Sequence, residues 1–286
     1  MTQLIDGKAI AAAVGEQVRA QVAALAAAGV TPRLAVVIAT ADDGAAWYVR
    51  SINRAAARLG VGCAVHELAP DAREQTITSL LASLAEDDQV HGIVCQTPLP
   101  AGVRIERVAQ QIPPAKDVDG ANPQSLGMLA AGLPDAYPPA TAAAVVEILA
   151  QAGTALEGRR AVVVGRSTVV GKPVALLLLA RNATLTICHS RTEDLASVCR
   201  EGDVLVAAAG KPALIGAGHV RPGAVVIDVG ISASADGSLV GDVDTQAVTG
   251  IAAAITPVPG GVGPVTTMLL MRQTAHAAGV LAGLTS

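Results

Sequence analysis

Short runs of β-branched residues alternate along the chain with alanine-rich stretches of helical period. In the first half, strands are expected over 34–38, 63–68 and 92–95, with helices near 45–59 and 74–85 between them. Strands that alternate with helices in this order favour parallel βαβ units, in which helices cover both faces of the sheet. The hydrophobic pattern therefore predicts an α/β fold.

A segment rich in proline and glycine, residues 113–139, interrupts this pattern. It contains the charged sequence Lys116-Asp117-Val118-Asp119-Gly120, a composition typical of a functional loop. A helix near 142–151 follows, and a new series of strands then begins. We therefore place a domain boundary at this segment.

The second series repeats the alternation of strands and helices. Its strands are expected over 161–164, 185–188, 204–207 and 225–229. A helix over about 169–180 separates the first two of them. The proline- and glycine-rich run from Thr256 to Pro264 cannot form the interior of a helix or strand, so we interpret it as a shaped loop before a helix over about 265–278.

Composition and charge exclude several classes of partner. The 286-residue chain has a net charge of −4, and no run of Lys or Arg is long enough to follow a phosphate backbone, so we expect no nucleic-acid partner. Asp6 and Lys8 precede the first apolar run, and no apolar stretch approaches the roughly 18 residues of a membrane span. We therefore expect no membrane partner and predict a cytoplasmic protein.

The residue types that bind metals are scattered along the chain. The four cysteines form no CxxC pair and lie mostly in apolar stretches, as reduced core cysteines do. The five histidines lack the spacing of a ligand cluster, so no metal is expected. These residues are Cys63, Cys95, Cys188, Cys199, His66, His91, His189, His219 and His276.

A candidate nucleotide site follows the first strand of the second series. Residues 165–173 read Gly-Arg-Ser-Thr-Val-Val-Gly-Lys-Pro and lead into a helix. In such a strand-turn-helix arrangement, backbone N–H groups and a helix N-terminus can meet a phosphate. Gly165 permits the tight turn, and Gly171 removes a side chain where the helix passes close to sheet or ligand. A tight turn that binds no ligand is the alternative, because this glycine spacing also occurs in ordinary βα turns.

The end of the next strand indicates which nucleotide such a site binds. NAD sites usually have an acidic residue there for the ribose hydroxyl, whereas NADP sites need positive charge. Here residues 188–192 read Cys-His-Ser-Arg-Thr, without a carboxylate. Ser190 and Arg191 can hydrogen-bond a 2′-phosphate, and Arg166 can reach it from the first turn. NADP is therefore favoured over NAD, the alternative being that Arg191 is a solvated loop cation.

Several longer strings occur together in the chain. They are IDGK (5–8), QTPLP (96–100), KDVDG (116–120), GRSTVVGKP (165–173), ATLTICHSRT (183–192), GKP (210–212), VVIDVG (225–230), GDVD (241–244) and TPVPGGVGP (256–264). In this order and at this spacing they resemble the methylenetetrahydrofolate dehydrogenase/cyclohydrolase family. The resemblance covers nearly the whole chain.

The resemblance implies two α/β domains that flank a cleft, assembled as a homodimer. A folate-binding catalytic domain would comprise residues 1–140 and be completed by the C-terminal helix 264–286. A Rossmann-type NADP-binding domain would comprise residues 141–263. The implied reaction is NADP-dependent oxidation of 5,10-methylenetetrahydrofolate, a small-molecule folate, to 5,10-methenyltetrahydrofolate.

The resemblance also implies catalytic roles for three residues. Tyr48 would border the folate, Gln96 would lie beside the reacting carbon, and Asp119 would bind the amino nitrogens of the pterin. An alternative for Asp119 is a loop carboxylate neutralised by Lys116. The implied substrate-binding residues are Tyr48, Gln96, Pro98, Leu99, Asp119, Gly260, Gly261 and Pro264. The implied cofactor-binding residues are Gly165, Arg166, Ser167, Val170, Gly171, His189, Ser190, Arg191, Ala209, Gly210 and Ile231.

One departure from the family affects the second family activity, hydrolysis of the methenyl product to 10-formyltetrahydrofolate. That step needs a group that moves a proton, and family members place a lysine four residues after the tyrosine. This chain has Ile52 there, which can transfer no proton. Arg50 and Arg54 project to other sides of the helix, and an arginine stays protonated. We therefore expect cyclohydrolase activity to be absent or severely reduced.

Further departures affect the folate side, at Ala45, Asn122, Ser125, Met128 and Pro139-Ala140. They leave the exact folate substrate open. Two alternatives to a dehydrogenase without cyclohydrolase activity stay open as well. One is the bifunctional enzyme, with Tyr48, Gln96 and water acting without the lysine. The other is a protein that binds NADP or folate but has lost catalysis.

Overall fold

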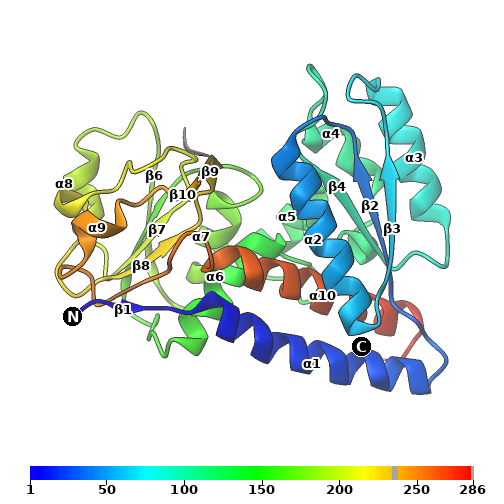
Figure 1. Ribbon diagram of the computed structural model, residues 1–286, viewed down its shortest axis with the longest axis horizontal. Coiled ribbons are helices and arrows are strands. Elements are labelled where there is room, and N and C mark those ends of the chain that lie inside the picture. The colour runs from blue at the N-terminus through cyan, green and yellow to red at the C-terminus, as the bar shows by residue number, and fades with distance from the viewer. Residues whose placement is uncertain (234–237, 285–286) are drawn as a thin grey trace. The chain divides into compact units, whose positions relative to one another are not determined.

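The structure is a computed structural model that describes residues 1–233 and 238–284. The chain divides into two compact units, whose helices and strands are labelled in Figure 1. Unit 1 comprises residues 1–12 and 141–266, and unit 2 comprises residues 13–140 and 267–286. The unit boundaries fall within helices, namely α1 (Gly7–Ala27), α6 (Ala140–Gln151) and α10 (Val262–Leu281).

Unit 2 is built on a parallel three-stranded sheet of order β3-β2-β4. The strands are β2 (Arg33–Ile38), β3 (Gly62–Glu67) and β4 (Gly92–Gln96). The central strand β2 is buried from its second residue to its last, as expected for a parallel strand with both faces covered. Because β2 and β4 are parallel, their carboxyl ends lie at the same edge of the sheet, with Ile38 opposite Gln96.

Helix α2 (Asp43–Leu59) of unit 2 begins and ends where the sequence supplies caps. The Asp42 carboxylate accepts the N–H of Ala45 at 2.7 Å, and Gly60 ends the helix with a φ of +77°. The other helical elements of the unit are α3 (Glu74–Glu86), α4 (Ile105–Val108), α5 (Pro123–Ala130) and the 3₁₀ turns η1 (Ala109–Gln111) and η2 (Pro114–Lys116). A fully buried aliphatic cluster that includes Val37, Ile77 and Ile93 joins α3 to the sheet.

Unit 1 contains a six-stranded sheet of order β1-β11-β8-β7-β5-β6, and all its pairings are parallel. The strands are β1 (Gln3–Leu4), β5 (Arg160–Val164), β6 (Thr184–Cys188), β7 (Val204–Ala207), β8 (Val225–Asp228) and β11 (Ala254–Ile255). The chain starts the second series at β5, adds β6 on one side and β7 on the other, so the strand order reverses at β5. Ligands of open parallel sheets bind at the carboxyl ends of the strands at such a reversal.

The remaining elements of unit 1 are short. They are α7 (Gly171–Leu179), α8 (Leu195–Cys199), α9 (Thr245–Val248), the 3₁₀ turn η3 (Ala217–His219) and the antiparallel pair β9 (Ser232–Ala233) and β10 (Leu239–Val240). Strand β6 forms one edge of the sheet and β1 the other, and Ile187 on β6 is 43% exposed. The core of the unit is aliphatic, with two buried cysteines, Cys188 and Cys199.

The predicted α/β fold with two domains and a parallel sheet in each is confirmed. Every predicted strand is present to within one residue at each end, from β2 through β8. Sequence reasoning missed helix α1 and strands β1 and β11. Residues 1–12, predicted within the first domain, are grouped with unit 1, where β1 pairs with β11. The assignment of folate and NADP to the two domains stays a prediction, as does a cleft between them.

Candidate functional site

The turn after β5 in unit 1 requires glycine at two positions. Gly165 has a φ of +138°, and a Cβ there would overlap the carbonyl oxygen of Ala208. A Cβ at Gly171, the first residue of α7, would overlap the carbonyl oxygen of Gly165. The turn and the start of α7 therefore pack backbone against backbone, as the sequence predicted for a close approach.

Ser167 organises the same turn. Its hydroxyl oxygen accepts the N–H groups of Val170 and Gly171 at 3.1 and 3.3 Å, so it caps the start of α7. Arg166 and Ser167 are exposed, and Val170 is half-buried. The guanidinium of Arg166 is therefore free to reach a ligand above the carboxyl end of β5.

The loop after β6 is held by two of its own side chains. Thr192 accepts the N–H of His189 at 2.9 Å, and the Nδ1 atom of His189 accepts the N–H of Arg191 at 3.2 Å. With Nδ1 as an acceptor, a neutral His189 carries its proton on Nε2. Ser190 and Arg191 are left exposed. Among the described residues, no ion pair involves Arg166 or Arg191.

The loop after β7 is fixed by a buried carboxylate that sequence reasoning missed. Asp242 accepts the backbone N–H groups of Ala209, Gly210 and Lys211 at 2.6, 2.9 and 2.8 Å. It is fully buried, so these three donors compensate for the loss of water around the charge. Ala209 and Gly210, both predicted to bind the cofactor, thus owe their backbone conformation to Asp242.

A second buried carboxylate holds the first. Asp228 ends β8 and accepts the backbone N–H groups of Gly230, Asp242 and Val243 at 3.0, 2.9 and 2.9 Å. Burial raises the pKa of Asp228 to about 6, although these three donors act in the opposite direction. The sequence signal for both residues was an acidic position inside otherwise apolar or glycine-rich strings, VVIDVG and GDVD.

Two further segments of unit 1 carry predicted site residues, namely the segment after β8 and the loop that leads into α10. Ile231 follows Gly230 and is 60% exposed. The predicted folate-loop residues Gly260, Gly261 and Pro264 also belong to unit 1. A Cβ at Gly261 would lie 2.6 Å from the carbonyl oxygen of Pro257, so this loop too is closely packed.

The chemistry of these residues fits a phosphorylated nucleotide. The loops after β5 and β6 expose two guanidinium groups and two hydroxyl groups, and the strand after β5 ends without a carboxylate. Arginine forks and hydroxyls recognise phosphate oxygens, and a 2′-phosphate needs positive charge at the end of the second strand. The three loops project from the carboxyl ends of neighbouring strands at the strand-order reversal.

In unit 2, Asp119 lies in a loop whose shape is set by another carboxylate. The buried Asp117 accepts the N–H groups of Ala121 and Asn122, both at 2.9 Å. Asp119 is half-buried and accepts the N–H of Ala140 at 3.2 Å. Burial raises the pKa of Asp119, the hydrogen bond from Ala140 lowers it and the negative charge of Asp117 raises it, and together they place it at about 7.

Lys116 does not neutralise Asp119. Its side chain is buried, and its Nζ donates to the carbonyl oxygens of Ala85 and Asp87, both at 2.8 Å. The alternative in which Asp119 is a loop carboxylate paired with Lys116 is therefore wrong. Asp119 keeps its carboxylate available for a ligand.

Tyr48 and Gln96 lie on the elements next to Asp119. Burial raises the pKa of the Tyr48 hydroxyl, the charge of Asp119 raises it further, and a hydrogen bond with the side chain of Thr267 lowers it. Burial and then the charge of Asp119 also raise the pKa of Cys95, which precedes Gln96 on β4, to about 12. Asp119 thus lies within electrostatic reach of both α2 and the end of β4. The Thr267 contact was not predicted.

The remaining predicted residues of unit 2 follow β4. Gln96 is half-buried, and its Nε2 donates to the carbonyl oxygen of Thr97 at 2.6 Å. The Thr97–Pro98 peptide bond is cis; Pro98 is exposed and Leu99 is half-buried. These residues form the segment that continues from the carboxyl end of the sheet.

Ile52 lies one turn after Tyr48 on α2. Its side chain is fully buried, with 0% exposure. Residues four apart share a helix face, so Ile52 occupies the position beside Tyr48 with an aliphatic side chain. Neither Arg50 nor Arg54 replaces it, because both are exposed.

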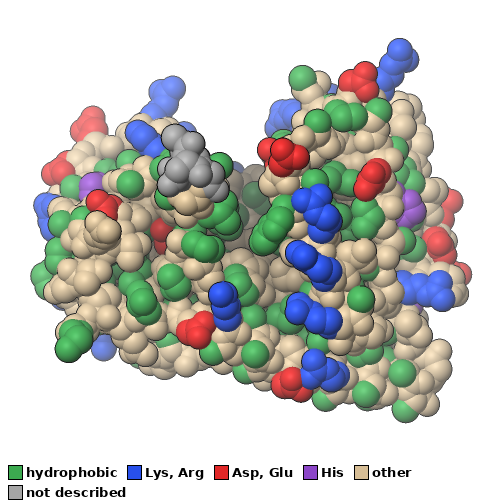
Figure 2. All heavy atoms as spheres, in the orientation of Figure 1, with side chains coloured by type: hydrophobic (Ala, Val, Ile, Leu, Met, Phe, Trp, Pro, Cys, Tyr) green, Lys and Arg blue, Asp and Glu red, His purple; other side chains and the backbone are tan. Residues whose placement is uncertain are grey.

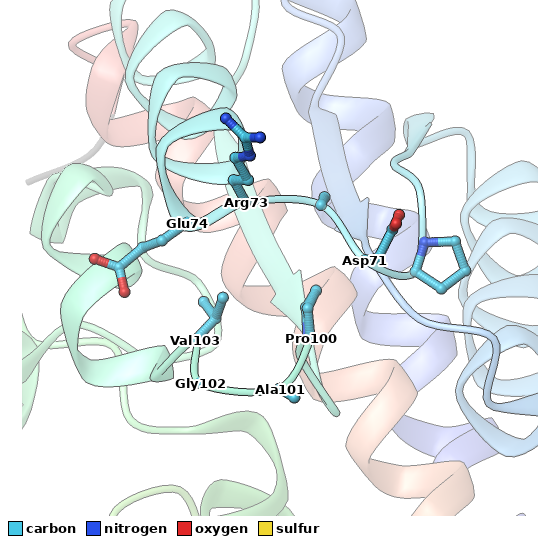
Figure 3. A pocket seen from close by; sticks show the side chains of 9 residues that line it. Asp71, Arg73, Glu74, Pro100, Ala101, Gly102 and Val103 are labelled. Atoms are coloured by element: carbon cyan, nitrogen blue, oxygen red, sulfur yellow. The ribbon is translucent and has the colours of Figure 1, made fainter.

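A separate hollow of about 520 Å³ lies in unit 2 (Figure 3). It is lined by Pro70, Asp71, Ala72, Arg73, Glu74, Pro100, Ala101, Gly102 and Val103. Figure 3 shows that the side chains of Arg73, Glu74 and Asp71 point in different directions, so they do not converge on one ligand position. None of the predicted site residues lines it.

Residues 1–233 and 238–284 contain neither a membrane-spanning helix nor a cluster of metal-binding side chains. None of the helices there is long and apolar enough to cross a membrane. In the same ranges, no group of three or more His, Cys, Asp or Glu side chains could hold a metal ion.

Comparison with known proteins relates both halves of the chain to the same enzymes. Residues 5–119 match the family model of the tetrahydrofolate dehydrogenase/cyclohydrolase catalytic domain, and residues 139–281 match the NAD(P)-binding domain of that family. The chain is 60% identical over 277 residues to the bifunctional protein FolD of Parafrankia sp. (strain EAN1pec), covering 97% of this chain and 99% of the relative.

Solved structures agree with this similarity. The bifunctional enzyme FolD-methylenetetrahydrofolate dehydrogenase/cyclohydrolase from Campylobacter jejuni matches with a TM-score of 0.94 and 36% identity, over 98% of this chain and 99% of that one. The N5,N10-methylenetetrahydrofolate dehydrogenase-cyclohydrolase (FolD) of Trypanosoma brucei, solved with NADP cofactor and an inhibitor, matches with a TM-score of 0.92 and 36% identity, over 98% of both chains.

Proposed function

Since the chain belongs to the tetrahydrofolate dehydrogenase/cyclohydrolase family, we propose that it oxidises 5,10-methylenetetrahydrofolate with NADP and lacks an effective cyclohydrolase step. The observation that carries the second part is Ile52, which places an aliphatic, fully buried side chain beside Tyr48. Relatives are named bifunctional, so a missing cyclohydrolase step would set this chain apart from what those names state.

The cofactor is NADP, and unit 1 holds it. Arg191 and Ser190 would bind its 2′-phosphate, Arg166 and Ser167 would bind from the turn after β5, and the loop at Ala209–Gly210 would border it. When bound, NADP supplies the hydride acceptor. The protein's own task is to hold the two reacting groups within about 3–3.5 Å of each other.

The dehydrogenase step asks for little acid or base from the protein. Loss of a hydride from a carbon between two nitrogens leaves an amidinium-like cation, which those nitrogens stabilise. Asp119 can accept two parallel N–H bonds from the guanidine-like edge of the pterin, and this binding favours its ionised form. Tyr48 would border the folate as a neutral hydroxyl, because its pKa lies above the ordinary value.

Hydrolysis of the methenyl product requires more from the protein's side chains than the dehydrogenase step does. Water addition and ring opening require a group that takes and returns a proton near neutral pH. Tyr48 is a poor substitute, because burial moves its pKa away from neutrality. Arginine side chains stay protonated. The lysine position of the family is filled by Ile52, so this helix offers no such group.

One observation favours the bifunctional alternative. The pKa of Asp119 is raised to about 7, which suits a proton carrier at neutral pH. The two roles compete, because a carboxylate that accepts two N–H groups from the pterin is held ionised and occupied. We therefore assign Asp119 to pterin binding.

The oligomeric state and location are finer points of the same proposal. We propose a homodimer that uses the edge strand β6 of the unit 1 sheet and the neighbouring end of α7, where Ile187 and Leu179 are 43% and 58% exposed. Light scattering of the wild type and of Ile187→Lys tests it: a dimer that becomes monomeric supports this edge, and a monomeric wild type rejects it. The cytoplasmic location stays a prediction.

The activity is tested by supplying the protein with NADP and methylenetetrahydrofolate and following NADPH by its absorbance. The proposal expects NADPH formation that saturates with both compounds and is weaker with NAD. If purified protein forms no NADPH but still binds NADP, the chain is a binding protein and the proposal is wrong.

A further inference from the structure

One face of α2 carries an exposed indole and three guanidinium groups in a line. Trp47, Arg50, Arg54 and Arg58 follow each other at intervals of three, four and four residues, which places them on one side of the helix. All four are exposed, and Trp47 is 55% exposed. Figure 2 shows a row of Lys and Arg side chains over α2. We call this set the arginine face of α2.

The arginine face is not explained by ion pairing. Among the described residues, no ion pair or side-chain hydrogen bond involves Arg50, Arg54 or Arg58. Arginines elsewhere on the surface do pair, as Arg19 with Glu16, Arg107 with Glu74 and Arg221 with Asp203 show.

The helix gains little from this arrangement, since only Arg58, in its last turn, is favoured by the helix dipole. Like charges four residues apart destabilise a helix, and α2 contains two such pairs, Arg50 with Arg54 and Arg54 with Arg58. The chain is acidic as a whole, with a net charge of −4. A concentration of unpaired positive charge on one helix of an acidic protein indicates an anionic ligand.

The ligand's position follows from the other faces of the same helix. Tyr48 follows Trp47 in the sequence, and Ile52 lies two residues after Arg50. Tyr48 and Ile52 lie on the helix face assigned to the folate in the proposed function, on which this inference rests. Folates end in a glutamate, and further glutamates are added through the side-chain carboxylate. Each added residue leaves one α-carboxylate, so the tail is an extended polyanion.

The spacing of the two partners agrees. Arginines four residues apart on a helix are separated by about 6 Å along its axis. One γ-linked glutamate repeat contains five backbone bonds and extends by about 6 Å. Guanidinium groups form two-pronged hydrogen bonds with carboxylates, and the exposed ring of Trp47 can cover the apolar start of the tail.

We propose that the arginine face of α2 binds the poly-γ-glutamate tail of the folate substrate, with Trp47 at the start of the tail and Arg58 farthest along it. The carboxylate of Asp43 lies one turn before Trp47 and repels a polyanion, so the tail runs toward the C-terminal end of the helix. Three guanidinium groups match about three carboxylates. A nucleic acid would need a longer basic surface than this face provides.

The test compares substrate tails of different length. Wild type is assayed for NADPH formation with methylenetetrahydrofolate carrying one or five glutamates, beside the triple variant Arg50→Gln/Arg54→Gln/Arg58→Gln. The control is Arg19→Gln/Arg73→Gln/Arg104→Gln, which removes the same charge from the surface of the same unit.

The inference expects a KM about tenfold lower for the pentaglutamate in wild type and in the control, with little change in kcat. The arginine-face variant should lose this advantage and keep its monoglutamate KM. High salt should reduce the advantage in wild type. Equal KM values for both tails in wild type, or an advantage retained by the arginine-face variant, would overturn the inference.

A second measurement separates this inference from the proposed function. Trp47 is the only tryptophan of the chain, so its fluorescence reports on ligands at the arginine face. Titration with free penta-γ-glutamate should change the Trp47 signal in wild type and not in the arginine-face variant, whether or not NADPH is formed. No response in wild type, or tighter binding of a single-stranded oligonucleotide of equal charge, would overturn it.

Discussion

The backbone N–H of Asp242 donates a 2.9 Å hydrogen bond to the buried carboxylate of Asp228. The carboxylate of Asp242 in turn receives three N–H groups from Ala209, Gly210 and Lys211. Two acidic residues thus connect the end of β8 to the loop after β7. This chain of contacts ties the predicted cofactor loop to the end of β8.

Replacing Asp242 should affect both stability and NADP binding. Asp242→Ala leaves the part-buried N–H groups of Ala209, Gly210 and Lys211 without this acceptor, so we expect a loss of about 2–4 kcal/mol in the free energy of unfolding. Asp242→Asn keeps one acceptor oxygen and should cost about 1–3 kcal/mol, with the Kd for NADP raised about tenfold. Urea unfolding and NADP titration measure these effects.

The matched control for Asp242 is Asp244→Asn. Asp244 is exposed and caps α9 by accepting the N–H of Ala247 at 3.0 Å. Its loss should cost no more than about 1 kcal/mol and leave the NADP affinity unchanged. An Asp242→Asn variant that binds NADP as tightly as wild type would show that the loop does not depend on this carboxylate.

Arg191→Ala should weaken NADP much more than NAD. The expected loss is about 10- to 100-fold in NADP affinity, because a charged hydrogen bond to the 2′-phosphate disappears, with at most about a twofold change for NAD. Arg159→Ala, an exposed arginine of the same unit, serves as the control. Equal weakening of both nucleotides would mean that Arg191 does not contact the 2′-phosphate.

The raised pKa of Asp119 predicts that substrate binding depends on pH. Its pKa is about 7 in the free protein, and the pterin binds the ionised form, so kcat/KM for the folate should rise with pH and level off above about 7. Asp119→Asn should lower kcat/KM at least about 100-fold and remove this limb. A profile of wild type that is flat between pH 5 and pH 8, a range that includes this pKa, contradicts the assignment.

The same carboxyl group affects stability in a defined direction. The folded protein holds the Asp119 proton up to about pH 7, whereas the unfolded chain releases it near the ordinary value of 3.8. Its contribution to stability is therefore complete below that value and is lost as the pH rises through about 7. Asp119→Asn should flatten this part of the stability curve, measured as Tm against pH.

Ile52→Lys should raise hydrolysis of methenyltetrahydrofolate above the uncatalysed rate. A lysine buried beside Tyr48 has a lowered pKa and can carry the proton, at a cost of about 3–5 kcal/mol in stability. Ile52→Met conserves the side-chain volume and should leave the rate of hydrolysis unchanged. It should change the free energy of unfolding by no more than about 1.5 kcal/mol. If the wild type hydrolysed methenyltetrahydrofolate at a high rate and Ile52→Met lowered that rate, the result would contradict the role assigned to Ile52.

Much of the fold was predictable because parallel strands buried on both faces are near-continuous apolar runs. Gly165 and Gly171 were identifiable as close-approach positions, and the structure shows the backbone contacts that require them. Helix α1 was missed, although Ile10, Val14, Val18, Val22 and Leu25 are buried at helical spacing, because exposed alanines between them weaken the contrast with the other faces of the helix. The pairing of β1 with β11 joins residues about 250 positions apart, and two-residue strands carry no pattern.

The candidate site was also predictable only in part. Arg191 was found from its position after a strand, and Asp119 from the charged loop KDVDG and the family resemblance. The partners of Lys116 were not found, because its acceptors are the carbonyl oxygens of Ala85 and Asp87. The role of Asp242 was likewise hidden, since a backbone N–H leaves no trace in the sequence. Contacts made by side chains with a distant main chain have to be seen in the structure.

The most direct test follows NADPH and methenyltetrahydrofolate together in one reaction of the wild-type protein with NADP and methylenetetrahydrofolate. We expect the two to accumulate in equal amounts, apart from uncatalysed decay of the methenyl compound, because Ile52 leaves the second step without a proton carrier. Methenyltetrahydrofolate that stays low while NADPH and 10-formyltetrahydrofolate rise together would contradict this account.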